Sequence, residues 1–227
     1  MSASKDWNSS GDRVVVGSYS QMDNIFSGGG SICCWAFPRS NGIGTTVARL
    51  AQKGPGTLQD PGWRWTFRGD NGISFSYRFD FAARWDTTTE ITYNEWTYFS
   101  VTYNNSSTSN QPKIYFNSIE QPFDEGVTPT GFATSDAGQN LFIGNINELN
   151  RTADGFFSYF QMWDRIISQK EIKESMHKPG SIRDGLVGFW PLTDDGSTQR
   201  NLIGIGNTGA VTGATNSADG PPVTSFK

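Results

Sequence analysis

Hydrophobic and polar residues alternate with a period of two along much of the chain, which is typical of β-strands with one buried face. The clearest case is W-R-W-T-F-R from Trp63, then the turn G-D-N-G, then I-S-F-S-Y-R-F-D from Ile73, and this order predicts a β-hairpin. One face of the hairpin carries the large hydrophobic residues Trp63, Trp65, Phe67, Ile73, Phe75, Tyr77 and Phe79. The other face carries Arg64, Thr66, Arg68, Ser74, Ser76, Arg78 and Asp80. We interpret the aromatic face as core rather than as a surface for ligands.

Further strands are predicted where apolar runs lie between turn residues. These runs cover residues 11–17, 31–37, 45–53, 94–103, 113–117, 140–145, 155–163 and 185–190. Loops are predicted around Arg84-Trp85-Asp86 and from Asp124 to Gly138.

One short helix is predicted near residues 168–176. Ser168 and Glu171 have the spacing of a capping box, Ile172 and Met176 share one helical face, and a Pro-Gly pair follows. A lone amphipathic helix among strands has to dock on a sheet. The pattern therefore predicts an all-β fold, a sandwich of two antiparallel sheets with one helix. At 227 residues the chain can form a single domain. We expect residues 1–10 to form an N-terminal arm and residues 193–227 to pack as an extended segment on the outside of the sandwich.

Composition and charge exclude several classes of function. A net charge of −4 disfavours a nucleic-acid partner, and no apolar run is long enough to span a membrane. The polar start M-S-A-S-K-D-W-N-S-S lacks the apolar region of a signal peptide, so synthesis in the cytosol is expected. Cys33 and Cys34 are neighbours in a predicted strand and point to opposite faces, which favours two buried free thiols over a disulfide or a metal site. The single histidine, His177, excludes a multi-histidine zinc site and is expected at the end of the helix.

Four segments, in order, resemble the laminin-G-like, concanavalin A-like jelly-roll family. They are S-I-C-C-W-A-F-P from Ser31; E-W-T-Y-F-S-V-T-Y from Glu95 with K-I-Y-F-N after it; L-F-I-G-N with the later G-F-F-S-Y-F-Q-M-W-D-R-I-I-S-Q-K-E-I; and G-L-V-G-F-W-P-L-T-D-D-G. The similarity spans roughly residues 11–220. It implies a jelly-roll sandwich in which Trp35, Trp96, Trp163 and Trp190 occupy core positions. This fold hosts lectins, hydrolases, adhesion modules and viral structural proteins, so the resemblance alone does not select a function.

No cofactor is predicted. Members of this family often bind calcium through aspartates and backbone carbonyls, which leaves a calcium site open. The loop aspartates Asp6, Asp12, Asp124, Asp194 and Asp195 nevertheless form no tight cluster of the kind that calcium loops contain.

A glycoside hydrolase on this fold needs two carboxyl groups that flank the scissile bond. The hydrolase branches of the superfamily carry an E-x-D-x-x-E strand, which is absent here. Asp80 is isolated, Asp124 and Glu125 are neighbours in a predicted loop, and Glu148 stands alone. We therefore predict that the chain is not an enzyme.

A glycan site needs exposed aromatic rings beside planar polar side chains. Trp85, in a predicted loop between Arg84 and Asp86, is the candidate platform, although a buried anchoring role for this tryptophan is equally open. Asn104 and Asn105, at the start of a polar loop, complete the candidate site.

These features favour a non-catalytic recognition module. A fold typical of extracellular recognition, without a secretion signal or disulfides, suggests a protein on the exterior of a phage-like virion, as a head decoration or tail component. Its expected partners are other structural subunits, including copies of itself, and cell-surface glycans bound weakly. The alternative is a free-standing carbohydrate-binding lectin domain.

Overall fold

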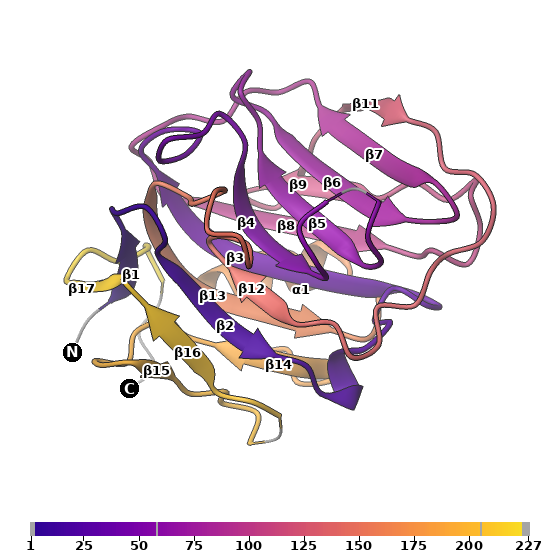
Figure 1. Cartoon of the computed structure of the whole chain (residues 1–227). Helices are drawn as coiled ribbons and strands as arrows, with labels where there is room; N and C mark the ends of the chain where they lie inside the picture. Colours follow the sequence, from indigo (N-terminus) through magenta and orange to yellow (C-terminus); the bar gives the residue numbers. More distant parts are fainter. Residues whose placement is uncertain (1–2, 58, 205, 224–227) are drawn as a thin grey trace.

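The computed structural model describes residues 3–57, 59–204 and 206–223, whose strands form two antiparallel sheets packed face to face (Figure 1). The eight-stranded sheet has the order β10 (Ile119–Glu120), β9 (Lys113–Phe116), β8 (Thr97–Tyr103), β3 (Gly30–Pro38), β13 (Gly155–Trp163), β1 (Ser4–Trp7) and β17 (Thr215–Ser217), with β14 (Leu186–Trp190) also paired to β13. The nine-stranded sheet has the order β11 (Phe123–Val127), β7 (Ala82–Thr87), β6 (Ile73–Arg78), β5 (Trp63–Phe67), β4 (Ala48–Lys53), β12 (Leu141–Ile143), β2 (Arg13–Gly17), β16 (Gly209–Thr212) and β15 (Thr198–Gln199). The predicted jelly-roll sandwich is confirmed.

The main hydrophobic core lies between the sheets and is rich in aromatic rings. The predicted β5–β6 hairpin forms, and the side chains of its hydrophobic face, Trp63 through Phe79, are buried. Phe75 packs edge-on against Tyr103 of the opposite sheet, with ring centroids 5.6 Å apart. Trp63 and Trp65 are thus core residues, as the alternation predicted.

A second, smaller cluster lies on the outer face of the eight-stranded sheet, beneath the helix α1 (Gln169–His177). Trp35 Nε1 donates to the backbone oxygen of Met176 at 3.0 Å, and the Tyr98 hydroxyl lies 3.0 Å from Ser175 Oγ. The predicted capping box is present, with Ser168 as N-cap and Glu171 three residues later. The helix therefore covers one outer face of the sandwich.

Cys33 and Cys34 illustrate how one strand serves both clusters. Both thiols are free and fully buried, as predicted. Cys34 belongs to the core between the sheets, whereas Cys33 belongs to the cluster beneath the helix. Burial raises the pKa of Cys33 to about 12.

Two predictions about loops were wrong. Residues around Trp85 form strand β7 rather than a loop, and the first part of the predicted 124–138 loop forms β11, which pairs with β7. The expected N-terminal arm contains β1, which is hydrogen-bonded between β13 and β17. In the segment after residue 193, β16 pairs with β2 and extends the nine-stranded sheet.

The η1 turn (Ser20–Met22) lies next to a buried ion-pair cluster. Lys53 has a fully buried side chain and donates to Asp23 at 2.7 Å and to Asp136 at 2.8 Å.

Among the described residues no helix combines the length and apolar character that a bilayer span requires.

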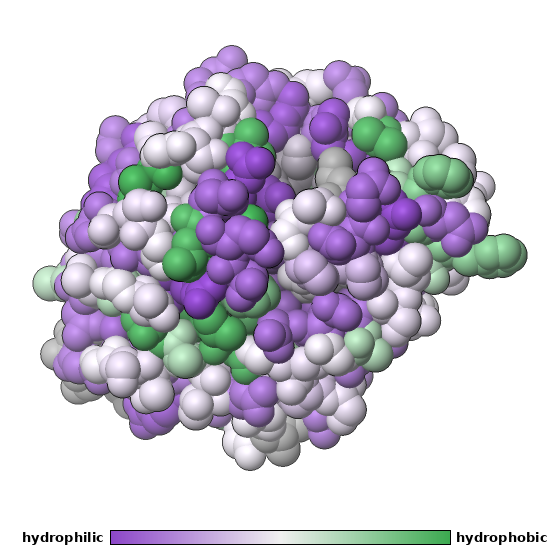
Figure 2. All heavy atoms as spheres, in the orientation of Figure 1, coloured by the Kyte–Doolittle hydropathy of each residue, from purple (hydrophilic) through white to green (hydrophobic). Residues whose placement is uncertain are grey.

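The outer face of the nine-stranded sheet lacks a helical cover in the described part of the chain, since α1 lies on the other sheet. The side of the molecule shown in Figure 2 is mostly hydrophilic or neutral, with hydrophobic side chains in separate patches. The uncovered face of β4 to β7 is where we place the candidate site.

Candidate functional site

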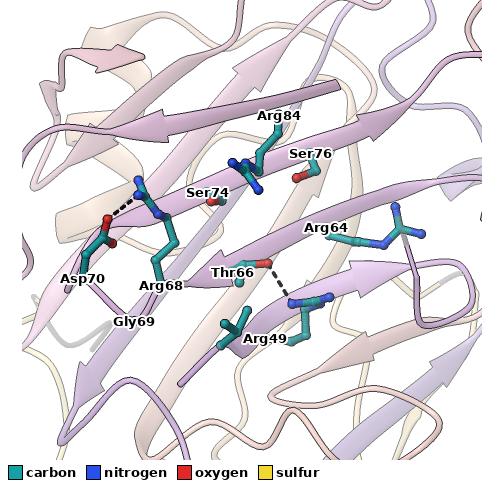
Figure 3. A pocket seen from close by; sticks show the side chains of 10 residues that line it. Arg49, Arg64, Thr66, Arg68, Gly69, Asp70, Ser74, Ser76 and Arg84 are labelled. Carbon is teal, nitrogen blue, oxygen red and sulfur yellow. Dashed lines mark hydrogen bonds and ion pairs between the residues drawn. The ribbon is translucent and has the colours of Figure 1, made fainter. Parts of the chain in front are cut away.

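A groove of about 360 Å³ crosses the outer face of β4, β5, β6 and β7 (Figure 3). We call it the arginine groove, and it is lined by Val47, Arg49, Arg64, Thr66, Arg68, Gly69, Asp70, Ser74, Ser76 and Arg84. Arg68 and Asp70 lie at one end of it and Arg64 at the other. Its volume is within the range of about 300–1,000 Å³ that is usual for small-molecule sites.

The groove forms because side chains of different length alternate along two rows of residues that run across the strands. One row aligns Arg49 with Thr66, Ser74 and then Asp86, and the other aligns Arg64 with Ser76 and then Arg84. Small hydroxyl side chains therefore stand in the middle strands, and long guanidinium side chains flank them. Neighbouring strands are about 4.8 Å apart, so short residues between long ones leave a hollow.

Two of the four arginines are balanced by carboxylates. Arg68 forms an ion pair with Asp70, and Arg84 Nε donates to Asp86 at 3.0 Å. Asp86 also accepts a hydrogen bond from the Ser74 hydroxyl, which fixes the carboxylate beside the groove. The Arg84 side chain is 39% exposed, so part of its guanidinium remains open to solvent.

Arg49 is buried and has only neutral partners. Its Nε donates to Gln52 at 3.0 Å and its Nη1 donates to Thr66 at 3.1 Å. Burial, with the nearby charges of Arg64 and Arg151, lowers the pKa of Arg49 to about 9.

Arg64 is 2% exposed, and fewer of its guanidinium nitrogens have hydrogen-bond partners than those of Arg49. Its Nη2 donates to the backbone oxygen of Asp60 at 3.1 Å, whereas Nε and Nη1 are buried with no hydrogen-bond partner in the described chain. Burial lowers the pKa of Arg64 to about 10, despite the nearby Asp60 charge. Buried guanidinium nitrogens without partners are costly, so this arrangement calls for an explanation.

The predicted glycan platform is wrong in its central residue. Trp85 lies in β7 with no exposed surface, and its ring stacks on Phe75 at 6.3 Å and packs against Tyr103 at 5.1 Å. Because side chains alternate along a strand, Arg84 and Asp86 point away from Trp85, to the outer face. Arg84 lines the arginine groove, and Asp86 is its ion-pair partner.

Asn104 and Asn105 are not brought to this groove. Asn104 follows β8 and lines a separate hollow, in which its Oδ1 accepts from Ser106 N at 2.9 Å. Asn105 is buried, and its backbone N–H donates to Phe26. The five predicted site residues therefore do not form one site.

Sequence reasoning missed the groove itself, chiefly Arg49 and Arg64. The polar face of the hairpin carries three arginines, Arg64, Arg68 and Arg78, beside three hydroxyl residues and one aspartate. Those arginines were the available signal. The alignment of Arg49 with Thr66 could not be deduced without the strand register.

An acidic hollow adjoins the groove, lined in part by Asp70, Asp86, Glu90 and Asp124. Asp86 and Asp124 lie directly opposite each other on β7 and β11, although they are far apart in sequence. Among the described residues, no three histidine, cysteine or acidic side chains are grouped closely enough to hold a metal ion.

Comparison with solved structures shows the same fold at low sequence identity. A putative carbohydrate-binding protein from Bacteroides ovatus superposes with a TM-score of 0.67 at 14% identity, over 99% of this chain and 62% of its own. The chain thus spans less than two thirds of that protein. The CBM40 of the Ruminococcus gnavus IT-sialidase, solved with α2,3-sialyllactose, gives 0.51 at 15% identity, over 66% of this chain and 83% of its own. A heptameric pentraxin from Limulus polyphemus gives 0.51 at 12% identity, over 90% and 97%.

No curated protein matches the sequence significantly. A family model does match, over residues 8–173, which is well over half of the chain. This match confirms the family resemblance and covers the first three of the four sequence segments. The chain belongs to the concanavalin A-like lectin/glucanase superfamily.

Proposed function

We propose that this protein is a lectin-like, non-catalytic module that binds glycans in the arginine groove. The observation that carries the proposal is an open groove on the uncovered sheet face, with hydroxyl groups in the middle and guanidinium donors on both sides. Sugars present many hydroxyl acceptors, and donors held in place by a sheet bind them without a large ordering cost. The carbohydrate-binding proteins among the structural neighbours support this proposal.

The experiment is glycan-array binding, followed by calorimetry on the best ligand. Val47 lines the groove and is half-buried, so Val47→Trp fills the groove without removing a polar group. We expect this variant to lose binding. Asn104→Ala, in the other hollow, is the matched control and should bind normally. Unchanged binding by Val47→Trp, or loss only in Asn104→Ala, would place the site elsewhere.

Glycoside hydrolysis is the competing activity, because Asp86 and Asp124 face each other beside the groove. Asp86 is held by the Ser74 hydroxyl and Arg84 Nε, and these contacts indicate a structural role rather than catalysis. The test is release of reducing sugar from bound glycans. Release that disappears in Asp124→Asn would replace the non-catalytic proposal with a hydrolase.

Attachment to structural subunits on the exterior of a phage-like particle is the remaining proposal, and it rests on the sequence argument alone. We rank it below glycan binding for that reason. Co-purification with a capsid or tail protein, together with a negative glycan array, would reverse this order.

A further inference from the structure

The arginine groove contains two buried cations that the protein does not neutralise. Arg68 and Arg84 form ion pairs with carboxylates, but neither Arg49 nor Arg64 forms an ion pair with a described residue. Both unbalanced arginines are more than nine-tenths buried, at 7% and 2% exposed. The two arginines that do have carboxylate partners, Arg68 and Arg84, are the more exposed ones. Stability alone would favour the opposite, because a buried charge without a partner costs more than an exposed one.

Charge in the groove also opposes charge on the whole chain. The chain has a net charge of −4, whereas the groove is lined by four arginines and one aspartate. A local positive field on an acidic protein attracts anions to that place.

The N–H groups of Arg64 that have no partner indicate which chemical group a ligand would present. Arg64 Nε and Nη1 have no partner in the described chain, and each is a charged N–H donor that an oxygen of a carboxylate or sulfate can accept from. Arg64 starts a cross-strand row that continues through Ser76 to Arg84. Arg84 is two strands away from Arg64, or about 10 Å. A row of this length suits a group larger than an inorganic ion.

We infer that the arginine groove selects acidic glycans: a carboxylate or sulfate group of the sugar balances Arg64 and Arg49, while the sugar hydroxyls lie over Ser74, Ser76 and Thr66. This inference rests on the proposed glycan-binding function and specifies its ligand class.

The test compares matched ligands with and without charge. The wild-type protein is applied to an array of uronate-containing, sialylated, sulfated and neutral glycans. The best acidic hits are then measured by calorimetry beside their methyl-esterified or desulfated forms, which differ only in charge. We expect acidic glycans to bind and the neutral forms to bind about 10-fold to 100-fold more weakly. The carboxylated and sulfated sets separate the two sources of charge.

Variants test the residues. Arg64→Met keeps the aliphatic stem and should weaken acidic-glycan binding by about 10-fold or more. Arg84→Gln is a second variant at a more exposed position of the groove, and it should also weaken acidic-glycan binding. The control is Arg200→Gln, which removes one positive charge from a side chain that is 72% exposed and paired with Asp194, and it should change affinity less than twofold.

Each outcome is decisive. If neutral and acidic forms bind equally, the inference fails while the glycan-binding function stands. If no glycan binds, both fail. If inorganic sulfate or a DNA oligonucleotide binds as tightly as the acidic glycan, the groove is a general anion site and the inference is wrong.

Discussion

Replacing Arg64 with methionine should make the protein more stable, although it should weaken ligand binding. The side chain is 2% exposed, lacks an ion-pair partner among the described residues and leaves two nitrogens without hydrogen bonds. Methionine fills the space of the aliphatic stem and carries no charge. Exchange of a buried ionic group for an apolar one of similar volume is often neutral or stabilising.

The magnitude follows from the cost of the buried charge. Burial lowers the pKa of Arg64 from 12.5 to about 10, which corresponds to roughly 3 kcal/mol against the charged form at neutral pH. Loss of the hydrogen bond to the backbone oxygen of Asp60 costs about 1 kcal/mol, and imperfect packing of the new side chain offsets part of the remainder. We expect a net gain of about 1–2 kcal/mol, or roughly 2–8 °C in Tm for a chain of this size.

The pH dependence gives a second check. A base whose pKa is lowered on folding binds its proton less tightly in the folded state, so its destabilising effect is complete below the folded pKa and fades as pH rises above it. The advantage of Arg64→Met should therefore be full at pH 7 and shrink as pH rises through about 10.

Thermal unfolding at pH 7 and pH 10 measures both effects, with Arg200→Met as an exposed control whose Tm should stay close to that of the wild type. A fall in Tm for Arg64→Met at pH 7 would refute the reasoning, because it would mean that the charge is balanced within the protein.

Three further predictions concern the rest of the sandwich. Lys53→Met leaves Asp136 buried without its cation and should cost about 3–5 kcal/mol in denaturant unfolding, and a cost below 1 kcal/mol would show that the pair is not buried in solution. Ser168→Ala removes the helix N-cap and should cost about 1 kcal/mol, whereas Ser168→Asp, which still caps, should cost much less; equal losses would contradict the capping role. Cys33 and Cys34 should resist a thiol reagent in the native protein and react fully in denaturant, because burial raises both pKa values; rapid native labelling would contradict their burial.

Local sequence patterns predicted the parts of the fold that are strongly periodic. The hairpin from Trp63 to Phe79, the capping box at Ser168 and the burial of both cysteines all depend on neighbours within a few residues. Each was confirmed because local propensity and the global fold agree at these places.

Strand β7 was missed because Trp85 stands between two charged residues, which resembles a loop. The same alternation explains it: Trp85 enters the core while Arg84 and Asp86 face outward. Strand β11 (Phe123–Val127) was missed because it is an edge strand with no buried residue in its pattern, so hydrophobic periodicity gives no signal there.

The candidate site could not be assembled from sequence because it depends on register between strands. Arg49 meets Thr66 across β4 and β5, and a bulge between Arg49 and Ala51 shifts that pairing. The sequence could predict which residues form the polar face of the hairpin. It could not predict which side chains surround each arginine, and so it could not show that Arg49 and Arg64 lack a carboxylate partner among the residues that the structure describes.

The alternation in β5 and β6 separates the aromatic residues of the core from the residues that line the arginine groove. Thr66, Ser74 and Ser76 can be varied while the aromatic side chains behind them stay unchanged. A combinatorial library at these three positions, selected against different sugars, would thus explore new specificities on a constant scaffold. Binding preference could therefore be changed in this architecture without rebuilding its interior.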